Sequence, residues 1–114
     1  MRRLRETFST LFTYEFVMCL ISFAWQPGTS TPLRLIGNRD EFYARPTAPL
    51  AEWQDNPMLV GGRDLEAGGS WLAAKRSGVV AALTNVRDLQ LNVPPGAPSR
   101  GELVANALQC DDIE

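Results

Sequence analysis

Cys19 is the residue of this chain best suited to covalent chemistry, because it follows Met18 and opens an apolar run that extends to Trp25. If initiation or processing exposed Cys19, its thiol and a free α-amine would belong to one residue. The amine has an ordinary pKa of about 7.7 to 8.0 and the thiol one of about 8.5, so both change protonation near neutral pH. Such an amine can activate the side chain of its own residue as a nucleophile. The alternative is that Cys19 is a buried apolar residue of a strand, since free cysteine is among the most buried residue types.

Polar residues that could assist a thiol follow two later apolar runs. The cluster Asn38-Arg39-Asp40-Glu41 comes directly after Leu33–Gly37, and Asn85 ends the run that begins at Val79. Gly69, in a Gly-rich stretch, can let a ligand approach the backbone closely. Each has a simpler interpretation, because Arg39 and Asp40 can form a salt bridge at a strand end, Asn85 can cap a turn, and glycines serve turns. The glycine spacing is not that of a phosphate-binding loop.

Composition excludes several classes of site. The chain has no histidine, which excludes a Ser-His-Asp triad, a Cys-His pair, a zinc site that uses His and His ligation of haem within it. Its net charge is −2 and it has no long basic run, so nothing indicates a nucleic-acid partner. The two cysteines, Cys19 and Cys110, do not make a disulfide framework, and no metal site is predicted. No window is apolar enough for a transmembrane span.

Residues 1–17 are interpreted as an upstream extension. A basic start is followed by an apolar stretch that Glu15 interrupts, and no pair of small residues precedes Cys19, so the segment is not typical of a signal peptide. Translation from a misplaced start codon is the favoured interpretation. A removable propeptide, a mitochondrial-type presequence and an ordinary amphipathic helix are the alternatives.

The elements that must position these residues are short strands. Partial alternation and β-favouring residues predict strands at Cys19–Trp25 and Leu33–Gly37, paired as a hairpin. Shorter strands are predicted at Trp71–Ala74 and Val79–Leu83, joined by a hairpin connection in which Gly78 takes a positive φ.

The middle of the chain is predicted to be irregular. Arg45-Pro46 and Ala48-Pro49 should break regular structure, and Glu52–Pro57 is interpreted as a surface loop that contains Trp53. The tryptophans are interpreted as core or loop packing, not as a platform for an aromatic ligand; they are Trp25, Trp53 and Trp71.

The C-terminal part predicts a helix. Ser99-Arg100-Gly101-Glu102 is a capping box, and the apolar stripe that follows comprises Leu103, Val104, Ala107 and Leu108. Two hairpins followed by a helix predict an α+β fold with antiparallel strands. With 114 residues the chain suits one small domain, but one helix cannot cover the strands that precede it, so we expect residues 18–114 to be the N-terminal part of a truncated domain.

Several segments together resemble the NRDE family, the family of the animal transport and Golgi organisation protein two. The stretch from Met18 through the Asn38-Arg39-Asp40-Glu41 cluster to Pro46 carries the resemblance. Three further segments agree in order and spacing: Gly68-Gly69-Ser70-Trp71-Leu72, Gly78-Val79-Val80-Ala81-Ala82-Leu83-Thr84-Asn85 and Ser99-Arg100-Gly101-Glu102-Leu103-Val104. Members of the family begin at Met-Cys and are longer than this chain, which agrees with an extension before Met18 and with truncation.

The family is similar to the cysteine branch of the N-terminal-nucleophile hydrolases, which implies part of an αββα sandwich. The resemblance implies that Cys19 is the catalytic nucleophile, that Arg39 and Asp40 lie beside it, and that Asn85 donates to the oxyanion. Asn38 and Glu41, from the same cluster, and Gly69 are predicted to bind the ligand.

Two functions follow from the resemblance. One is an amide hydrolase or acyltransferase that uses Cys19 on a small-molecule substrate and needs no cofactor. The alternative is a non-catalytic binding protein for haem trafficking or for lipid-linked ligands, in which Cys, Met or Tyr would have to ligate a haem iron. The resemblance implies a cytoplasmic protein in a bacterium, or a cytosolic or organelle-associated one elsewhere. Nothing in the sequence indicates an oligomeric state.

Overall fold

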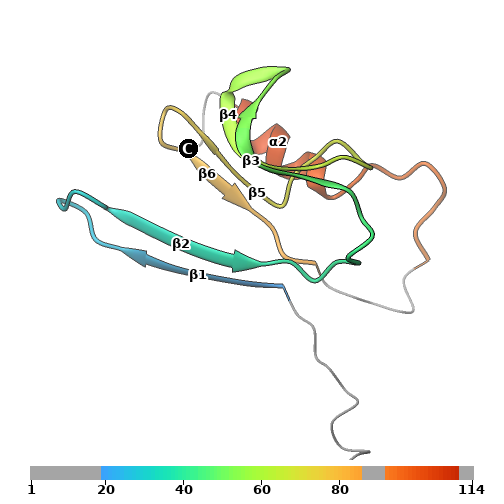
Figure 1. Cartoon of the computed structure of the whole chain (residues 1–114), viewed down its shortest axis with the longest axis horizontal. Coiled ribbons are helices and arrows are strands. Elements are labelled where there is room, and N and C mark those ends of the chain that lie inside the picture. The colour runs from blue at the N-terminus through green and yellow to red at the C-terminus, as the bar shows by residue number, and fades with distance from the viewer. Residues whose placement is uncertain (1–18, 86–91, 111–114) are drawn as a thin grey trace, which may run out of the picture.

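The structure is a computed structural model that describes residues 19–85 and 92–110. The described residues form two antiparallel sheets and one helix (Figure 1). The two-stranded sheet has the order β1-β2, and the four-stranded sheet has the order β3-β4-β5-β6. The elements are β1 (Leu20–Trp25), β2 (Leu33–Asn38), β3 (Thr47–Trp53), β4 (Asn56–Asp64), β5 (Leu72–Lys75), β6 (Val80–Ala82) and α2 (Gly101–Gln109).

The predicted first hairpin is confirmed. β1 and β2 pair from Leu20 opposite Asn38 to Trp25 opposite Leu33. The N–H of Gln26 closes the turn by donating to the Pro32 carbonyl oxygen at 2.7 Å. This register matters for the site, because it brings the start of β1, where Cys19 lies, next to the residues that follow β2.

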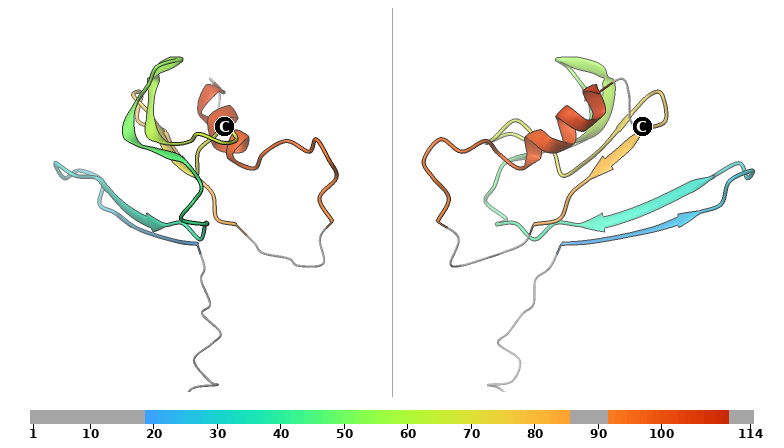
Figure 2. Two further views of the ribbon diagram at one scale, coloured as in Figure 1. Left: turned by 45° about the vertical axis from the view of Figure 1, so that its right-hand side comes forward. Right: turned by 180° about the vertical axis from the view of Figure 1, so that it is seen from behind.

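The β1–β2 hairpin extends away from the four-stranded sheet (Figure 2). Four of its large apolar residues, drawn from both faces, are between 62% and 74% exposed: Leu20, Phe23, Trp25 and Ile36. The prediction that Trp25 packs in a core or loop is therefore wrong for the described residues, because no neighbouring layer covers this hairpin.

The prediction that the middle of the chain is irregular is wrong. This part of the chain forms the hairpin of β3 and β4, whose strands are the two longest that the structure describes. Trp53 ends β3 and pairs with Asn56 at the start of β4, so the expected surface loop is only a tight turn. Pro49 is tolerated because β3 is an edge strand whose register shifts between Ala48 and Ala51, and a proline at an irregular edge removes no required ladder bond. Trp53 is buried, and its indole N–H donates to the Gly61 carbonyl oxygen at 3.3 Å.

The second predicted hairpin is confirmed. β5 pairs with β6, and the connection between them is closed by the Gly78 N–H, which donates to the Lys75 carbonyl oxygen at 2.9 Å. Gly78 has φ of 100°, a conformation that residues with a Cβ rarely adopt.

Helix α2 begins one residue later than the capping box predicted. Arg100 occupies the N-cap and makes no side-chain capping bond. Ser99 still contributes, because its hydroxyl oxygen accepts from the Gly101 N–H at 3.3 Å and its own N–H donates to Glu102 Oε1 at 3.4 Å. Of the predicted apolar stripe, only Val104 and Leu108 are buried, whereas Leu103 and Ala107 are exposed.

The core lies between the four-stranded sheet and α2. Its buried members are Trp53, Leu59, Ala73, Val104 and Leu108, and the partly buried Val79, Ala81, Leu83 and Ala105 pack against them. Since helix and sheet each bury one face against the other, this packing fixes α2 over β5 and β6.

The predicted α+β class with antiparallel strands is confirmed. The finer expectation of an αββα sandwich stays a prediction, because the described residues place one helix on one face of one sheet. The predicted extension at 1–17 lies outside the described residues. Across residues 19–85 and 92–110, no helix has the length and apolar character needed to cross a membrane.

Candidate active site around Cys19

Cys19 lies immediately before β1 and is partly buried. Its Sγ accepts a hydrogen bond from the backbone N–H of Asp40 at 3.2 Å. The antiparallel register produces this contact, since Leu20 is opposite Asn38 and the next residues on each side continue past the sheet. The contact holds the sulfur beside the segment that follows β2.

A small cavity of about 90 Å³ opens beside the Cys19 thiol. It brings together four of the predicted site residues, which are Cys19, Arg39, Glu41 and Asn85. Its other lining residues come from the segment after β2, the end of β4, the segment before β5, the segment after β6 and the start of α2: Arg45, Asp64, Ser70, Trp71, Leu83, Ser99, Arg100 and Gly101. Residues far apart in the sequence thus converge on one thiol.

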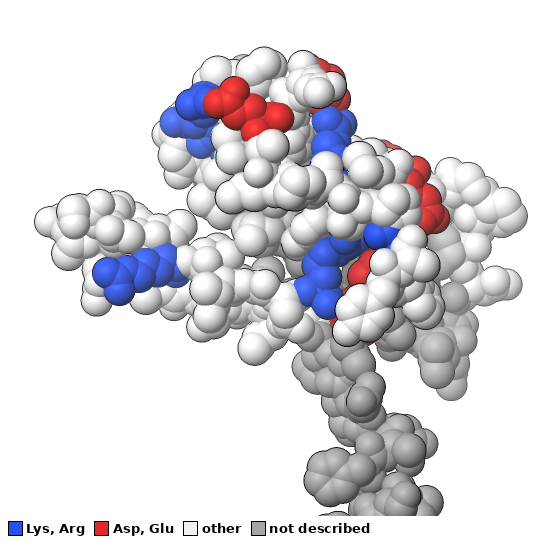
Figure 3. All heavy atoms as spheres, viewed as in Figure 1, with Lys and Arg blue, Asp and Glu red and all other residues white. Residues whose placement is uncertain are grey.

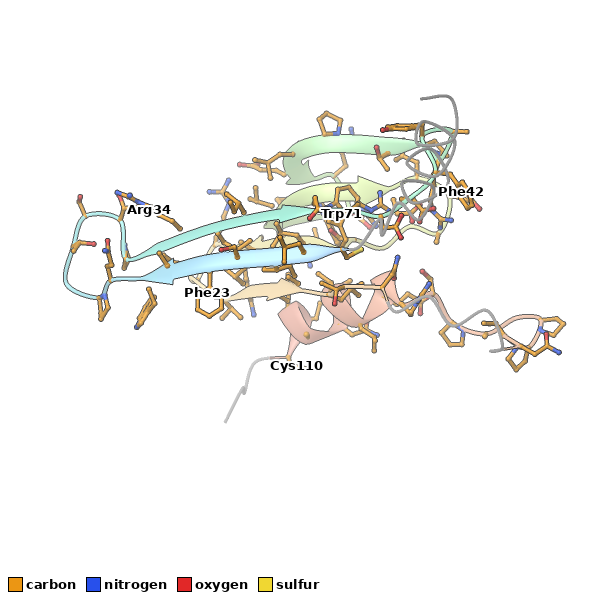
Figure 4. The ribbon with its side chains drawn as sticks, turned by 90° about the horizontal axis from the view of Figure 1, so that it is seen from below. Phe23, Arg34, Phe42, Trp71 and Cys110 are labelled. Carbon is orange, nitrogen blue, oxygen red and sulfur yellow. The ribbon has the colours of Figure 1, made fainter. Side chains whose placement is uncertain are left out.

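Arg39 is held in place on the cavity wall from two sides. Its guanidinium stacks on the Trp71 ring with the central carbon 3.9 Å from the ring centroid. Its Nη2 atom lies 3.7 Å from Glu41 Oε2 and 3.7 Å from Asp64 Oδ2. Figure 4 shows the labelled Trp71 between the hairpin and the four-stranded sheet. Trp71 therefore supports a site residue, a role that its sequence context did not predict.

Arg45 and Asp64 form the strongest ion pair of the cavity, and sequence reasoning missed both. Arg45 Nε donates to Asp64 Oδ2 at 2.8 Å, while Asp64 Oδ1 accepts from the N–H groups of Glu66 and Ala67 at 3.0 and 3.2 Å. Burial alone would raise the pKa of Asp64, but the Ala67 N–H, the Arg45 guanidinium and the Glu66 N–H together hold that pKa below its ordinary value. The hydrogen bond to Asp64 in turn raises the pKa of Arg45.

The charged groups of the site are packed against one another. Figure 3 shows Lys or Arg atoms touching Asp or Glu atoms near the centre of the face that it draws. An aspartate that follows a strand and precedes a turn with Gly68 can accept from the turn amides, and that pattern is the signal by which Asp64 could have been found.

Asp40 and Asn38 do not line the cavity. Asp40 is buried, and it contacts Cys19 through its backbone N–H. Asn38 Oδ1 accepts from the Leu20 N–H at 3.0 Å, so this side chain holds the open end of the hairpin. Both residues position Cys19 in the observed geometry.

Gly69 also lies outside the lining, where it allows a close approach of two backbones. A Cβ at Gly69 would overlap the backbone of Gly101, and the adjacent Ser70 N–H donates to the Gly101 carbonyl oxygen at 3.2 Å. This contact brings the start of α2 against the segment between β4 and β5. The absence of a side chain at Gly69 therefore places Ser99, Arg100 and Gly101 on the cavity wall.

Asn85 reaches the cavity from the segment after β6. The Leu83 N–H donates to the Trp71 carbonyl oxygen at 3.0 Å, which ties this segment to the start of β5. An amide side chain at the same cavity as a thiol is one of the groups that can donate to a developing oxyanion.

The arrangement suits acyl transfer through a thiol, since it combines a polarised sulfur, a nearby guanidinium and an amide donor. Within the described parts of the chain, no group of three or more His, Cys, Asp or Glu side chains could hold a metal ion. Cys110, the other cysteine, is free and exposed at the C-terminal end of α2 (Figure 4).

Comparison with known proteins places the chain among its relatives. A protein-family model for Transport and Golgi organisation 2 matches residues 18–114. The mouse Transport and Golgi organization 2 homolog is 42% identical over 101 residues, which are 82% of this chain and 36% of the mouse protein. The human homolog is 41% identical over 101 residues. The Drosophila melanogaster Transport and Golgi organization protein 2 is 39% identical over 107 residues, which are 85% of this chain and 37% of that protein. No solved structure matches the chain.

Proposed function

Since this chain belongs to the Transport and Golgi organisation 2 family, which is the NRDE family that its sequence resembles, we propose that Cys19 is the nucleophile of an amide hydrolase or acyltransferase. The substrate class is a small molecule with an acyl group on nitrogen. The chain spans 36% of the length of the mouse and human relatives, so the activity of the whole protein is part of the proposal. The names of these relatives refer to transport and Golgi organisation and state no reaction.

One observation carries the proposal. The Cys19 Sγ accepts the Asp40 N–H at 3.2 Å on the wall of a cavity that Arg39 and Asn85 also line. A cysteine that was only a buried apolar residue would need neither a polar donor nor a polar cavity. The cavity of about 90 Å³ fits the reacting end of a substrate, whereas whole ligands usually occupy at least about 300 Å³.

The chemistry requires that the functional protein begin at Cys19, through initiation at Met18 followed by its removal or through cleavage. The α-amine then serves as the base that accepts the thiol proton. The Arg39 guanidinium lines the same cavity and would face the sulfur once its proton has moved to the amine. The Asp40 carboxylate is the group that would hold the resulting ammonium, because Asp40 is buried and its backbone contacts Cys19.

The first half-reaction forms a thioester. The thiol proton moves to the α-amine, Sγ bonds to the carbonyl carbon, and the carbonyl oxygen becomes an oxyanion to which Asn85 donates. Removing one such donor typically costs about 2.7 to 4 kcal/mol of transition-state stabilisation. The oxyanion then collapses, the C–N bond breaks, and the departing nitrogen takes the proton from the α-ammonium.

The second half-reaction releases the acyl group. Water gives a proton to the α-amine while its oxygen bonds to the acyl carbon, the C–S bond breaks, and the thiol regains its proton. An amine or alcohol in place of water completes an acyl transfer. The proposal places this chemistry in the cytoplasm of a bacterium, or in a cytosolic or organelle-associated protein elsewhere, as the family resemblance implies.

The first prediction concerns this reaction. A chain that begins at Cys19 should hydrolyse N-acyl aminomethylcoumarin amides and should accumulate acyl groups on Cys19 with the activated donor p-nitrophenyl acetate. Both signals should vanish in Cys19→Ala, because the nucleophile is gone. Fluorescence and peptide mass spectrometry measure them. Cys110→Ala is the matched control and should behave as the unmodified chain, since Cys110 lies outside the cavity. Turnover that survives in Cys19→Ala would overturn the proposal.

A second candidate function is the binding of an apolar, lipid-like ligand without catalysis. A groove of about 490 Å³ lies on the four-stranded sheet, which is the size of a small-molecule site. Most of its lining is apolar side chains and glycines, including Leu50, Val60, Gly61, Leu72 and Val80. Binding of a fluorescent fatty acid that Val60→Glu abolishes and Cys19→Ala leaves unchanged would favour this candidate.

Haem fits neither the Cys19 cavity nor the apolar groove on the four-stranded sheet. The Cys19 cavity is far smaller than a porphyrin, and the described residues that line the groove include no Cys, Met, Tyr or His to ligate iron. No step of the proposed chemistry involves haem. A haem titration of the full chain with a shift of the Soret band, lost in Cys19→Ala, would contradict this conclusion.

A further inference from the structure

Arg100 is the charged residue of the Cys19 cavity for which the proposed chemistry gives no role. It lines the cavity from the N-cap of α2, and its side chain is exposed. Over the described ranges, no carboxylate pairs with it. A guanidinium is always charged at neutral pH, so the cavity contains a positive charge that no carboxylate of residues 19–85 or 92–110 pairs with.

The other two arginines of the cavity lie close to carboxylates. Arg45 is paired with Asp64 at 2.8 Å, and Arg39 lies 3.7 Å from Glu41 while stacking on Trp71. Asp40 does not line the cavity. The lining thus holds three guanidiniums and two carboxylates, and Arg100 is the excess charge.

The position of Arg100 is not explained by the stability of the helix. A side chain with an acceptor oxygen is preferred at the N-cap, and a positive charge there opposes the helix dipole. The nearby amides of α2 are already partly satisfied, because Gly101 donates to Ser99 Oγ and Glu102 donates to the Ser99 carbonyl oxygen. The guanidinium, not the amides, is therefore the group available to a ligand.

We infer that the Cys19 cavity selects molecules that carry an anionic group, a carboxylate or a phosphate, close to the reacting carbon, and that Arg100 binds that group. A guanidinium can pair with either anion through two parallel hydrogen bonds. That the anion belongs to an acyl substrate rests on the proposed function. The anion preference of the cavity does not rest on it.

Two alkylating reagents that differ only in charge test this inference on the full chain. Iodoacetate carries a carboxylate where iodoacetamide carries a neutral amide, and both alkylate thiolates. The rate constants for Cys19 and for Cys110 are measured in the same sample by peptide mass spectrometry. Cys110 is the internal reference, since it is exposed and does not line the cavity.

The quantity of interest is the ratio of the iodoacetate rate to the iodoacetamide rate at Cys19. Arg100→Gln should lower this ratio about two- to fivefold, the range expected for one exposed ion pair. Arg100→Lys should retain most of this ratio, because the positive charge is kept. In the unmodified chain, rising salt concentration should reduce the ratio. Arg34→Gln is the matched control. Arg34 is exposed on β2 toward the turn of the hairpin, away from Trp71 (Figure 4), so its loss should leave the ratio unchanged.

A ratio that is the same in Arg100→Gln and in the unmodified chain would overturn the inference, as would an equal fall in Arg34→Gln. Two quantities show whether a variant is folded: the iodoacetamide rate constant at Cys19, and the ratio of the two reagent rates at Cys110. Unfolding would change both quantities. The experiment needs neither the free α-amine nor amide hydrolysis. Its failure is therefore distinguishable from failure of the proposed function.

Discussion

Cys19, Asp40 and Arg39 owe their closeness to one register. The pairing of Leu20 with Asn38 brings the residue before β1 beside the two residues after β2. The hairpin pattern predicted that Cys19 and the Arg39–Asp40 pair lie at the same end of two paired strands, and the family resemblance supplied their roles. The pairing of Arg45 with Asp64 was not predicted, because it joins the segment after β2 to the end of β4, and the sequence patterns did not indicate that strand.

The residue-scale prediction concerns Asp64. Asp64→Asn should lower the free energy of unfolding at pH 7 by about 1 to 2 kcal/mol, because the amide loses the charged bond to Arg45. The pKa of Asp64 is lower in the folded chain than the ordinary value, so its contribution is present above that ordinary value and is lost as the pH falls through the folded-state pKa. The difference between the two proteins should therefore shrink below about pH 4. Urea unfolding at neutral and acid pH measures it.

Asp55→Asn is the control for this prediction. Asp55 also pairs with an arginine, Arg63, but it is exposed, so solvent screens the pair and the variant should differ less from the unmodified chain. A difference for Asp64→Asn that grows as the pH falls would contradict the assigned pairing.

At the scale of elements, the two hairpins that alternation and turn residues indicated are present, but the hairpin of β3 and β4 was not predicted. Its strands contain Pro49 and a Gly-rich stretch, both of which normally argue against strands. The edge position of β3 and the burial of Trp53 against Leu59 outweigh those local preferences, and both are properties of the assembled sheet.

Helix α2 supplies part of the cavity wall, so its anchoring can be tested separately. Leu108 is 1% exposed, and Leu108→Ala should destabilise the packing of α2 by about 2 to 5 kcal/mol. Loosening α2 moves Ser99 and Arg100 from the wall, so iodoacetamide should alkylate Cys19 faster. Amide hydrogen exchange along 101–109 measures the loosening of α2, and peptide mass spectrometry measures the alkylation of Cys19.

Leu103→Ala makes the same chemical change on the same helix at a side chain that is 65% exposed. It should leave exchange in α2 and alkylation of Cys19 nearly unchanged. Equal effects of the two variants would show that α2 is not held by the face that contacts the sheet.

At the scale of the whole molecule, the described residues form an open arrangement, because the β1–β2 hairpin extends away from the four-stranded sheet (Figure 2). The buried apolar core has five residues, and none of them comes from the β1–β2 hairpin. Sequence patterns could not predict this arrangement, because exposed positions of the hairpin, such as Phe23 and Ile36, have the residue types of a buried sheet.

This openness predicts uneven stability. Backbone amides of β1 and β2 should exchange with solvent faster than those of β4, β5 and α2, because only the latter surround the core. Hydrogen exchange followed by NMR or mass spectrometry measures the rates. Uniform protection across the first hairpin and the four-stranded sheet would mean that a layer covers the hairpin in solution.

The central claim is that Cys19 acts with its own α-amine, and the most direct measurement is the intact mass of the protein made from its own gene in its own host. The account predicts a mass that begins at Cys19, with thiol and amine both free. A mass that retains the residues before Cys19 would mean that the amine is blocked. That result would contradict the proposed nucleophile and base.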